Sequence, residues 1–152
     1  MRRIAGVLDR IVLAIASLLM VLIFIVAALG VIFRYWLQHS LPWADETAAY
    51  LFIWLVMFGA ASEVWNDGHP AVHVVVDRAG PRWRAVIKLV ANLTVAAWGA
   101  ILLVYGIKAV IIEAPESMSS LPGVSLQIPY AAIPIAGALI VVFALSKAVG
   151  RR

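Results

Sequence analysis

Long apolar runs separated by short charged segments dominate the chain. Four runs stand out, at residues 11–33, 47–62, 89–107 and 117–146, and none of them contains a charged residue. A helix needs about 20 mostly apolar residues to cross a bilayer. We therefore predict an all-α integral membrane protein, in which residues 1–152 form one domain of four transmembrane helices at approximately 11–34, 45–65, 83–112 and 129–148.

Two of the runs differ from an ordinary transmembrane helix, one in the residues before it and one in its length. The first follows Arg2, Arg3 and Arg10 in the manner of a secretory signal, but a signal has an apolar core of only about 7–15 residues. This run is longer, so we interpret it as a retained helix. The second run is short, and Trp43 and Trp65 flank it as interfacial anchors that extend the span.

The loop between the second and third runs has a pattern of its own. Asn66-Asp67-Gly68 is a turn signal, and Gly80-Pro81 breaks the chain before the third helix. Between them, apolar residues recur at helical spacing, at Val72, Val75, Val76 and Ala79. This pattern predicts a short amphipathic helix that lies in the membrane interface rather than crossing it.

The composition agrees with a membrane protein. Hydrophobic residues make up 64% of the chain and charged residues 13%, against about 45–50% and 25% in soluble domains. The sequence contains no cysteine, which excludes disulfides and thiolate chemistry. Its pI of about 9.9 would suggest nucleic acid in a soluble protein. Here the basic residues gather at the ends of the apolar runs, so we expect a lipid bilayer and no nucleic acid as the partner.

The basic residues also predict the orientation. Ten Lys and Arg lie in the two termini and the second loop, whereas the first and third loops contain only Arg34 and Lys108. Loops rich in Lys and Arg stay in the cytoplasm. We expect a bacterial inner-membrane protein with both its N- and C-termini in the cytoplasm.

No residue constellation suggests catalysis. The acidic and basic side chains lie at helix ends or in loops, and Asn92 and Thr94 are the notable polar residues of the spans, for which we expect interhelical hydrogen bonds. His69 and His73 have the i, i+4 spacing of paired metal ligands, but Pro70 intervenes and no cysteine joins them. We expect no metal, no cofactor and no enzymatic activity, and interpret His69 as bracing the turn.

Charged residues near the helix ends suggest ion pairs. Arg34 ends the first helix and Asp45 and Glu46 open the second, so a salt bridge between Arg34 and one of these acids is expected. Such pairs could fix the hairpin or face a partner subunit, and the sequence leaves both readings open. Glu63 could similarly meet Lys88 or Arg10 at the other membrane surface.

Small residues on three of the predicted helices permit close helix approach, either within this chain or with another membrane protein. They are Gly59-Ala60-Ala61, Ala96 and Ala100, and Ala132 and Ala136.

Taken in order, the residues resemble a known family, the small membrane (DctQ-type) subunits of tripartite ATP-independent periplasmic (TRAP) transporters. The matching features run across nearly the whole chain: Arg34, Trp43-Ala44-Asp45-Glu46, Trp54, Gly59-Ala60, Gly68-His69, Asp77, Pro81, Pro129 and Pro134.

The resemblance implies a heterotrimeric transporter. A periplasmic binding protein would capture an organic anion, such as a carboxylate or a sugar acid, and a large permease subunit would carry it inward, usually with sodium. The small subunit would be a static scaffold. By this resemblance, the structural or subunit-interface candidates are Arg34, Trp43, Asp45, Glu46, Gly59, Gly68 and His69, and none of them is a substrate ligand.

Two alternative functions belong to other classes of membrane protein. A self-sufficient four-helix multidrug antiporter needs a proton-binding carboxylate within a helix, and the first predicted helix has none. A membrane anchor of a redox complex would need histidines within its helices to hold haem, and the predicted helices contain none.

Overall fold

A computed structural model describes residues 2–66 and 80–149 of the chain, and over these ranges the fold is helical. The elements are α1 (Arg2–Tyr35), α2 (Pro42–Trp65), α4 (Pro81–Ile112), α5 (Gln127–Tyr130) and α6 (Ala132–Val149). Four helical segments are long and apolar enough to cross a membrane. The prediction of an all-α protein with four transmembrane helices is confirmed. The amphipathic segment predicted in the second loop lies in residues 67–79, outside the described ranges.

Proline marks where two of the helices start. Pro42 and Pro81 each occupy the first position of their helix, where a missing backbone N–H costs nothing. The fourth span is interrupted near its start. Pro129 lies in the single turn of α5, and after Ala131 the chain continues as α6, with Pro134 in the first turn.

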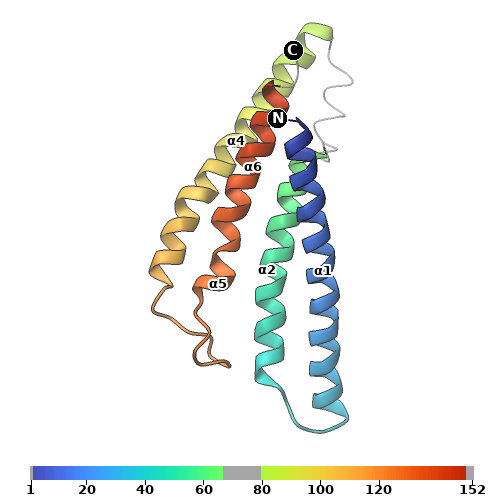
Figure 1. The fold of residues 1–152 in the computed structure, drawn as a ribbon, viewed down its shortest axis with the longest axis vertical. Helices are drawn as coiled ribbons and strands as arrows, with labels where there is room; N and C mark the ends of the chain where they lie inside the picture. Colours follow the sequence, from blue (N-terminus) through green and yellow to red (C-terminus); the bar gives the residue numbers. More distant parts are fainter. Residues whose placement is uncertain (1, 67–79, 150–152) are drawn as a thin grey trace.

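The helices pack as two hairpins (Figure 1). Helix α1 packs on α2, α4 packs on α6, and contact between α2 and α6 joins the pairs. Helix α6 is therefore central, and Ala132, Ala136 and Phe143 on it are fully buried. The start of α1 and the end of α6 lie at one end of the bundle, the terminal end. The α1–α2 turn and residues 113–126 lie at the other, the loop end.

Helix α1 contacts α2 through a seam with a seven-residue repeat. Its buried residues fall on two positions of that repeat, Ala5 and Val12 on one, and Asp9, Ala16 and Gly30 on the other. Such spacing is typical of helices that wind around each other with a small crossing angle. Phe58 of α2 packs against Val12 and Ala16.

Helices α4 and α6 approach each other through glycine. A Cβ placed on Gly137 would lie 2.6 Å from the backbone nitrogen of Leu103 and 2.8 Å from the carbonyl oxygen of Gly99. One placed on Gly106 would lie 2.7 Å from Pro134. Of the small residues that the sequence singled out on α4, Ala96 is half-buried and Ala100 is exposed, so Ala100 does not take part in this contact. The backbones meet where no side chain intervenes, and only glycine permits that distance.

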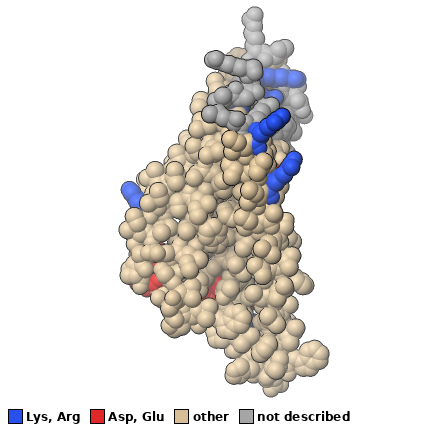
Figure 2. Space-filling model, viewed as in Figure 1, with Lys and Arg blue, Asp and Glu red and all other residues tan. Residues whose placement is uncertain are grey.

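Charge is distributed unevenly along the bundle. Figure 2 shows Lys and Arg gathered toward the terminal end of the visible face, with exposed acidic side chains toward the loop end. This polarity is the one that the sequence predicts from its basic loops.

Candidate functional site

Polar side chains tie the helices together at the loop end of the bundle. The expected salt bridge is formed there, between the Arg34 guanidinium and the Asp45 carboxylate, and it joins the end of α1 to the start of α2. The two side chains are 47% and 69% exposed. Pairs this exposed contribute little to stability, so the contact orients the turn more than it stabilises the fold.

The neighbouring acid makes a longer-range connection. One oxygen of Glu46 accepts hydrogen bonds from the Ser119 backbone N–H (3.1 Å) and the Tyr50 hydroxyl (3.1 Å). The other accepts from the Ser120 backbone N–H (2.8 Å) and the Ser120 hydroxyl. Since Ser119 and Ser120 belong to the α4–α5 loop, this one carboxylate links the α1–α2 hairpin to the α4–α6 hairpin.

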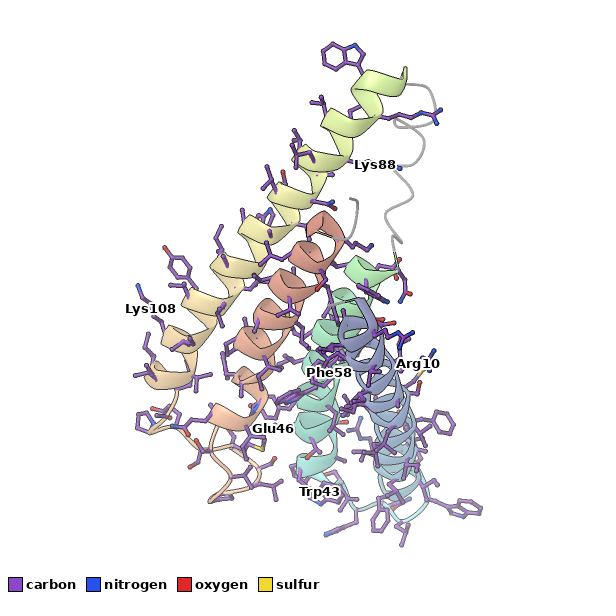
Figure 3. All side chains as sticks on the ribbon, turned by 45° about the horizontal axis from the view of Figure 1, so that its top comes forward. Arg10, Trp43, Glu46, Phe58, Lys88 and Lys108 are labelled. Carbon is purple, nitrogen blue, oxygen red and sulfur yellow. The ribbon has the colours of Figure 1, made fainter. Side chains whose placement is uncertain are left out.

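The loop that Glu46 holds is itself folded. The Met118 N–H donates to the Val124 carbonyl (2.9 Å) and the Leu126 N–H donates to the Glu116 carbonyl (3.0 Å). Met118 is buried, and Gly123 has a φ of +110°, a conformation that favours glycine. Glu46 therefore anchors a compact cap at the loop end. Figure 3 shows Trp43 and Glu46 together at this end of α2, and Trp43 is half-buried there.

A second polar cluster lies toward the terminal end. Asp9 of α1 is only 5% exposed and accepts hydrogen bonds from the Ser62 hydroxyl (2.5 Å) and the Asn66 amide (3.3 Å) of the α2 end. The Lys147 ammonium of α6 donates to the Val64 carbonyl (2.6 Å). These contacts join α1, α2 and α6, whereas the Glu46 contacts at the opposite end join α2 to the α4–α5 loop.

Sequence reasoning missed the Asp9 cluster. It placed Asp9 before the first helix, whereas α1 begins at Arg2 and includes it. The seven-residue repeat of α1 contained the signal, because Asp9 occupies a seam position alongside Ala5 and Val12. For the Glu46 contacts no comparable local signal exists.

Other expected contacts are absent from the described part of the chain. Glu63 forms no salt bridge with Arg10 or Lys88, which lie on different helices (Figure 3). The Thr94 hydroxyl donates to the Val90 carbonyl of its own helix (3.0 Å), not to another helix. Asn92 makes no side-chain hydrogen bond to another described residue. An exposed threonine satisfies its hydroxyl most simply within its own helix.

The remaining candidates differ in what surrounds them. Around Gly59, no atom lies within 4 Å of the position that a Cβ would take, so nothing in the described chain requires a glycine there. Gly68 and His69 lie outside the described residues. Within residues 2–66 and 80–149, no three acidic or histidine side chains are grouped so that they could hold a metal ion. The polar contacts between different elements, made by Arg34, Asp9, Glu46 and Lys147, connect helices or a helix and a loop.

Comparison with protein families gives this architecture its context. The family described as tripartite ATP-independent periplasmic transporters, DctQ component, matches residues 23–152. The chain belongs to the DctQ family. The match begins within α1 and includes both polar clusters except for Asp9.

Individual DctQ relatives support the assignment. A protein of Haemophilus influenzae named as a TRAP transporter small permease protein is 29% identical over 86 residues, which cover 57% of this chain and 51% of that protein. The C4-dicarboxylate TRAP transporter small permease protein DctQ of Vibrio cholerae is 33% identical over 75 residues, covering 49% of this chain and 32% of the relative. The chain thus spans about half, or less, of the length of these relatives.

Proposed function

We propose that the chain is the small permease subunit of a TRAP-type secondary transporter, where it acts as a static scaffold for a large permease subunit. The observation that most supports the scaffold role is the pair of polar clusters. At one end Asp9 joins α1 to α2 and Lys147 joins α6 to α2, and at the other end Glu46 joins α2 to the α4–α5 loop. A bundle tied at both ends suits a part that stays fixed while another subunit moves.

The transported substrate in this proposal is an organic anion, a carboxylate or a sugar acid, with sodium as the coupling ion. A periplasmic binding protein would deliver it to the large subunit. The Vibrio cholerae relative, whose name specifies C4-dicarboxylate, supports the carboxylate class. The small subunit contributes no substrate ligand in this scheme, because its best-connected carboxylates, Asp9 and Glu46, are engaged with other segments of this chain.

The proposed setting is the bacterial inner membrane, with both termini in the cytoplasm. The excess of Lys and Arg in the termini and the second loop supports this orientation. The terminal end of the bundle then faces the cytoplasm, and the cap held by Glu46 faces the periplasm.

A self-sufficient antiporter is not favoured. Asp9 is the one buried carboxylate among the described residues. Helix α1 has 34 residues and is therefore about 50 Å long at 1.5 Å per residue. The apolar layer of a bilayer is about 30 Å thick, so Asp9, seven residues from the helix start, lies near or beyond its edge. Its two hydrogen bonds to α2 indicate a fixed contact rather than a mobile proton carrier.

Affinity purification tests the proposal. A tagged chain, extracted gently from its native membranes, should bring down a large polytopic permease in stoichiometric amount, identified by mass spectrometry. Recovery of the chain alone or as a homodimer, in a detergent that preserves other membrane complexes, would contradict the subunit assignment.

A further inference from the structure

One face of α2 has no partner among residues 2–66 and 80–149. Apart from Pro42 at the start, every exposed residue of α2 falls on a single stripe along the helix. Phe52 is 55% exposed and Val56 is 45% exposed, although α2 packs against both α1 and α6 on its other sides. We name this row the α2 stripe, and it consists of Asp45, Ala49, Phe52, Val56, Ala60 and Glu63.

Glycine opens the α2 stripe to close approach. Gly59 lies beside Ala60 at the edge of the stripe, and a Cβ there would meet no atom within 4 Å. At the glycines between α4 and α6, by contrast, a backbone atom of the facing helix would lie within 3.1 Å of such a Cβ. In membranes, glycine on a helix surface permits another helix to come near. No described helix of this chain fills the space in front of Gly59, so that space is open to a helix of a partner.

The spacing on this face matches that of a helix seam. The exposed positions of the α2 stripe follow steps of four, three, four, four and three residues, and the strict alternation of four and three that α1 uses to contact α2 runs through the half-buried Gly59 in place of Ala60. This alternation keeps a row of residues facing one partner helix over its length.

The charge at the inner end of the α2 stripe indicates what kind of helix fits. The Glu63 carboxylate has no salt bridge or side-chain hydrogen bond within the described residues, whereas Asp45 at the outer end is paired with Arg34. In the proposed orientation Glu63 lies at the cytoplasmic surface, where anionic lipid headgroups repel a carboxylate. A cationic side chain near Glu63 would remove that repulsion.

We propose that the α2 stripe receives one transmembrane helix of the large permease subunit, with a Lys or Arg of that helix opposite Glu63. This proposal rests on the proposed function and adds to it the face of the chain that docks. A second copy of this chain fits less well. Two copies in one membrane are parallel, and a symmetric contact along the stripe would bring the two Glu63 carboxylates together.

Site-specific photocrosslinking tests the proposal in the assembled complex. The photoreactive amino acid p-benzoylphenylalanine replaces Phe52 in one variant and Phe24 of α1 in the control. Both native residues are exposed phenylalanines, at 55% and 74%, and both lie about ten residues from the loop end of their helices. The variants are expressed with the large permease subunit in native membranes and irradiated. We expect the crosslink to the large subunit to be several-fold stronger from Phe52 than from Phe24.

The outcomes separate the docking face from the proposed function. A crosslink to the large subunit from Phe24 and none from Phe52 would overturn the α2 stripe while leaving the subunit assignment intact. A Phe52 crosslink to a second copy of this chain would replace the proposal with self-association. Failure of the two subunits to co-purify at all would count against the proposed function itself.

A substitution provides a second readout. Gly59→Leu fills the open space on α2 and should not lower this chain's own helix content or thermal stability, because nothing lies within 4 Å and leucine favours a helix more than glycine does. It should reduce the large subunit that co-purifies several-fold. Ala97→Leu on the exposed side of α4 is the matched control and should not. Equal recovery from both variants would refute the docking face.

Discussion

The contact between α4 and α6 requires a glycine at position 137. In Gly137→Ala the new methyl group would sit 2.6 Å from the Leu103 nitrogen and 2.8 Å from the Gly99 carbonyl oxygen. Both atoms belong to the backbone of a helix and cannot rotate away. To restore an ordinary contact of 3.4 Å, the two helices must separate locally by about 0.8 Å, a gap that already forfeits a quarter to a half of the dispersion energy of each affected contact.

This overpacking should destabilise the bundle by about 1–3 kcal/mol. Gly59→Ala is the control, because its methyl group would enter open space and gain the helix preference of alanine, about 0.5–1 kcal/mol. The measurement is reversible unfolding of the purified chain in mixed micelles, followed by circular dichroism. If the unfolding midpoint of Gly137→Ala falls at the same mole fraction of denaturing detergent as that of the unsubstituted chain, α4 and α6 do not approach as closely as described.

The polar contacts lead to three further expected outcomes. Glu46→Gln should speed amide hydrogen exchange in residues 113–126 several-fold without affecting α1, and unchanged exchange there would show that the carboxylate does not hold the loop. Asp9→Ala leaves the Ser62 hydroxyl without its acceptor and should cost about 1–3 kcal/mol of unfolding free energy; Asp9→Asn, which keeps an acceptor, should cost less in the same titration. Arg34→Ala should lower stability by at most about 1 kcal/mol but reduce recovery of the large subunit, with the binding protein's own ligand affinity unchanged. Altered substrate preference in a fully assembled Arg34→Ala complex would contradict that reasoning.

The helices could be predicted because their signals are local. An apolar run long enough to cross a bilayer identifies a span by itself, and proline at positions 42 and 81 marks where two helices begin. The Arg34–Asp45 pair was also within reach, since only 11 positions separate the two residues across one hairpin.

Contacts between distant segments were beyond sequence reasoning. Glu46 and Ser120 lie 74 positions apart, and no pattern in either segment indicates that the two are in contact. The α4–α6 contact shows a related difficulty. The chain has 10 glycines and many alanines, and their spacing does not reveal which pair faces across a helix interface. Gly99 and Gly137 meet because of the tilt of two helices, a property of the whole bundle.

Because the chain has no cysteine, an engineered disulfide can test directly whether it acts as a static scaffold. The position of a Cβ on Gly30 of α1 lies 3.4 Å from the Ala44 Cβ of α2, close to the usual separation of about 3.5–4.5 Å in a disulfide. In the proposed orientation this pair faces the oxidising periplasm. The double variant Gly30→Cys/Ala44→Cys should therefore form an internal disulfide that locks the hairpin.

A static scaffold should tolerate that lock. The double variant would be reconstituted in proteoliposomes with its large permease subunit and periplasmic binding protein, and uptake of the binding protein's own ligand measured before and after reduction. We predict that uptake requires both membrane subunits and proceeds at the same rate with the disulfide formed or reduced. Uptake by the large subunit alone, or uptake that stops when the disulfide forms and recovers on reduction, would contradict the scaffold role.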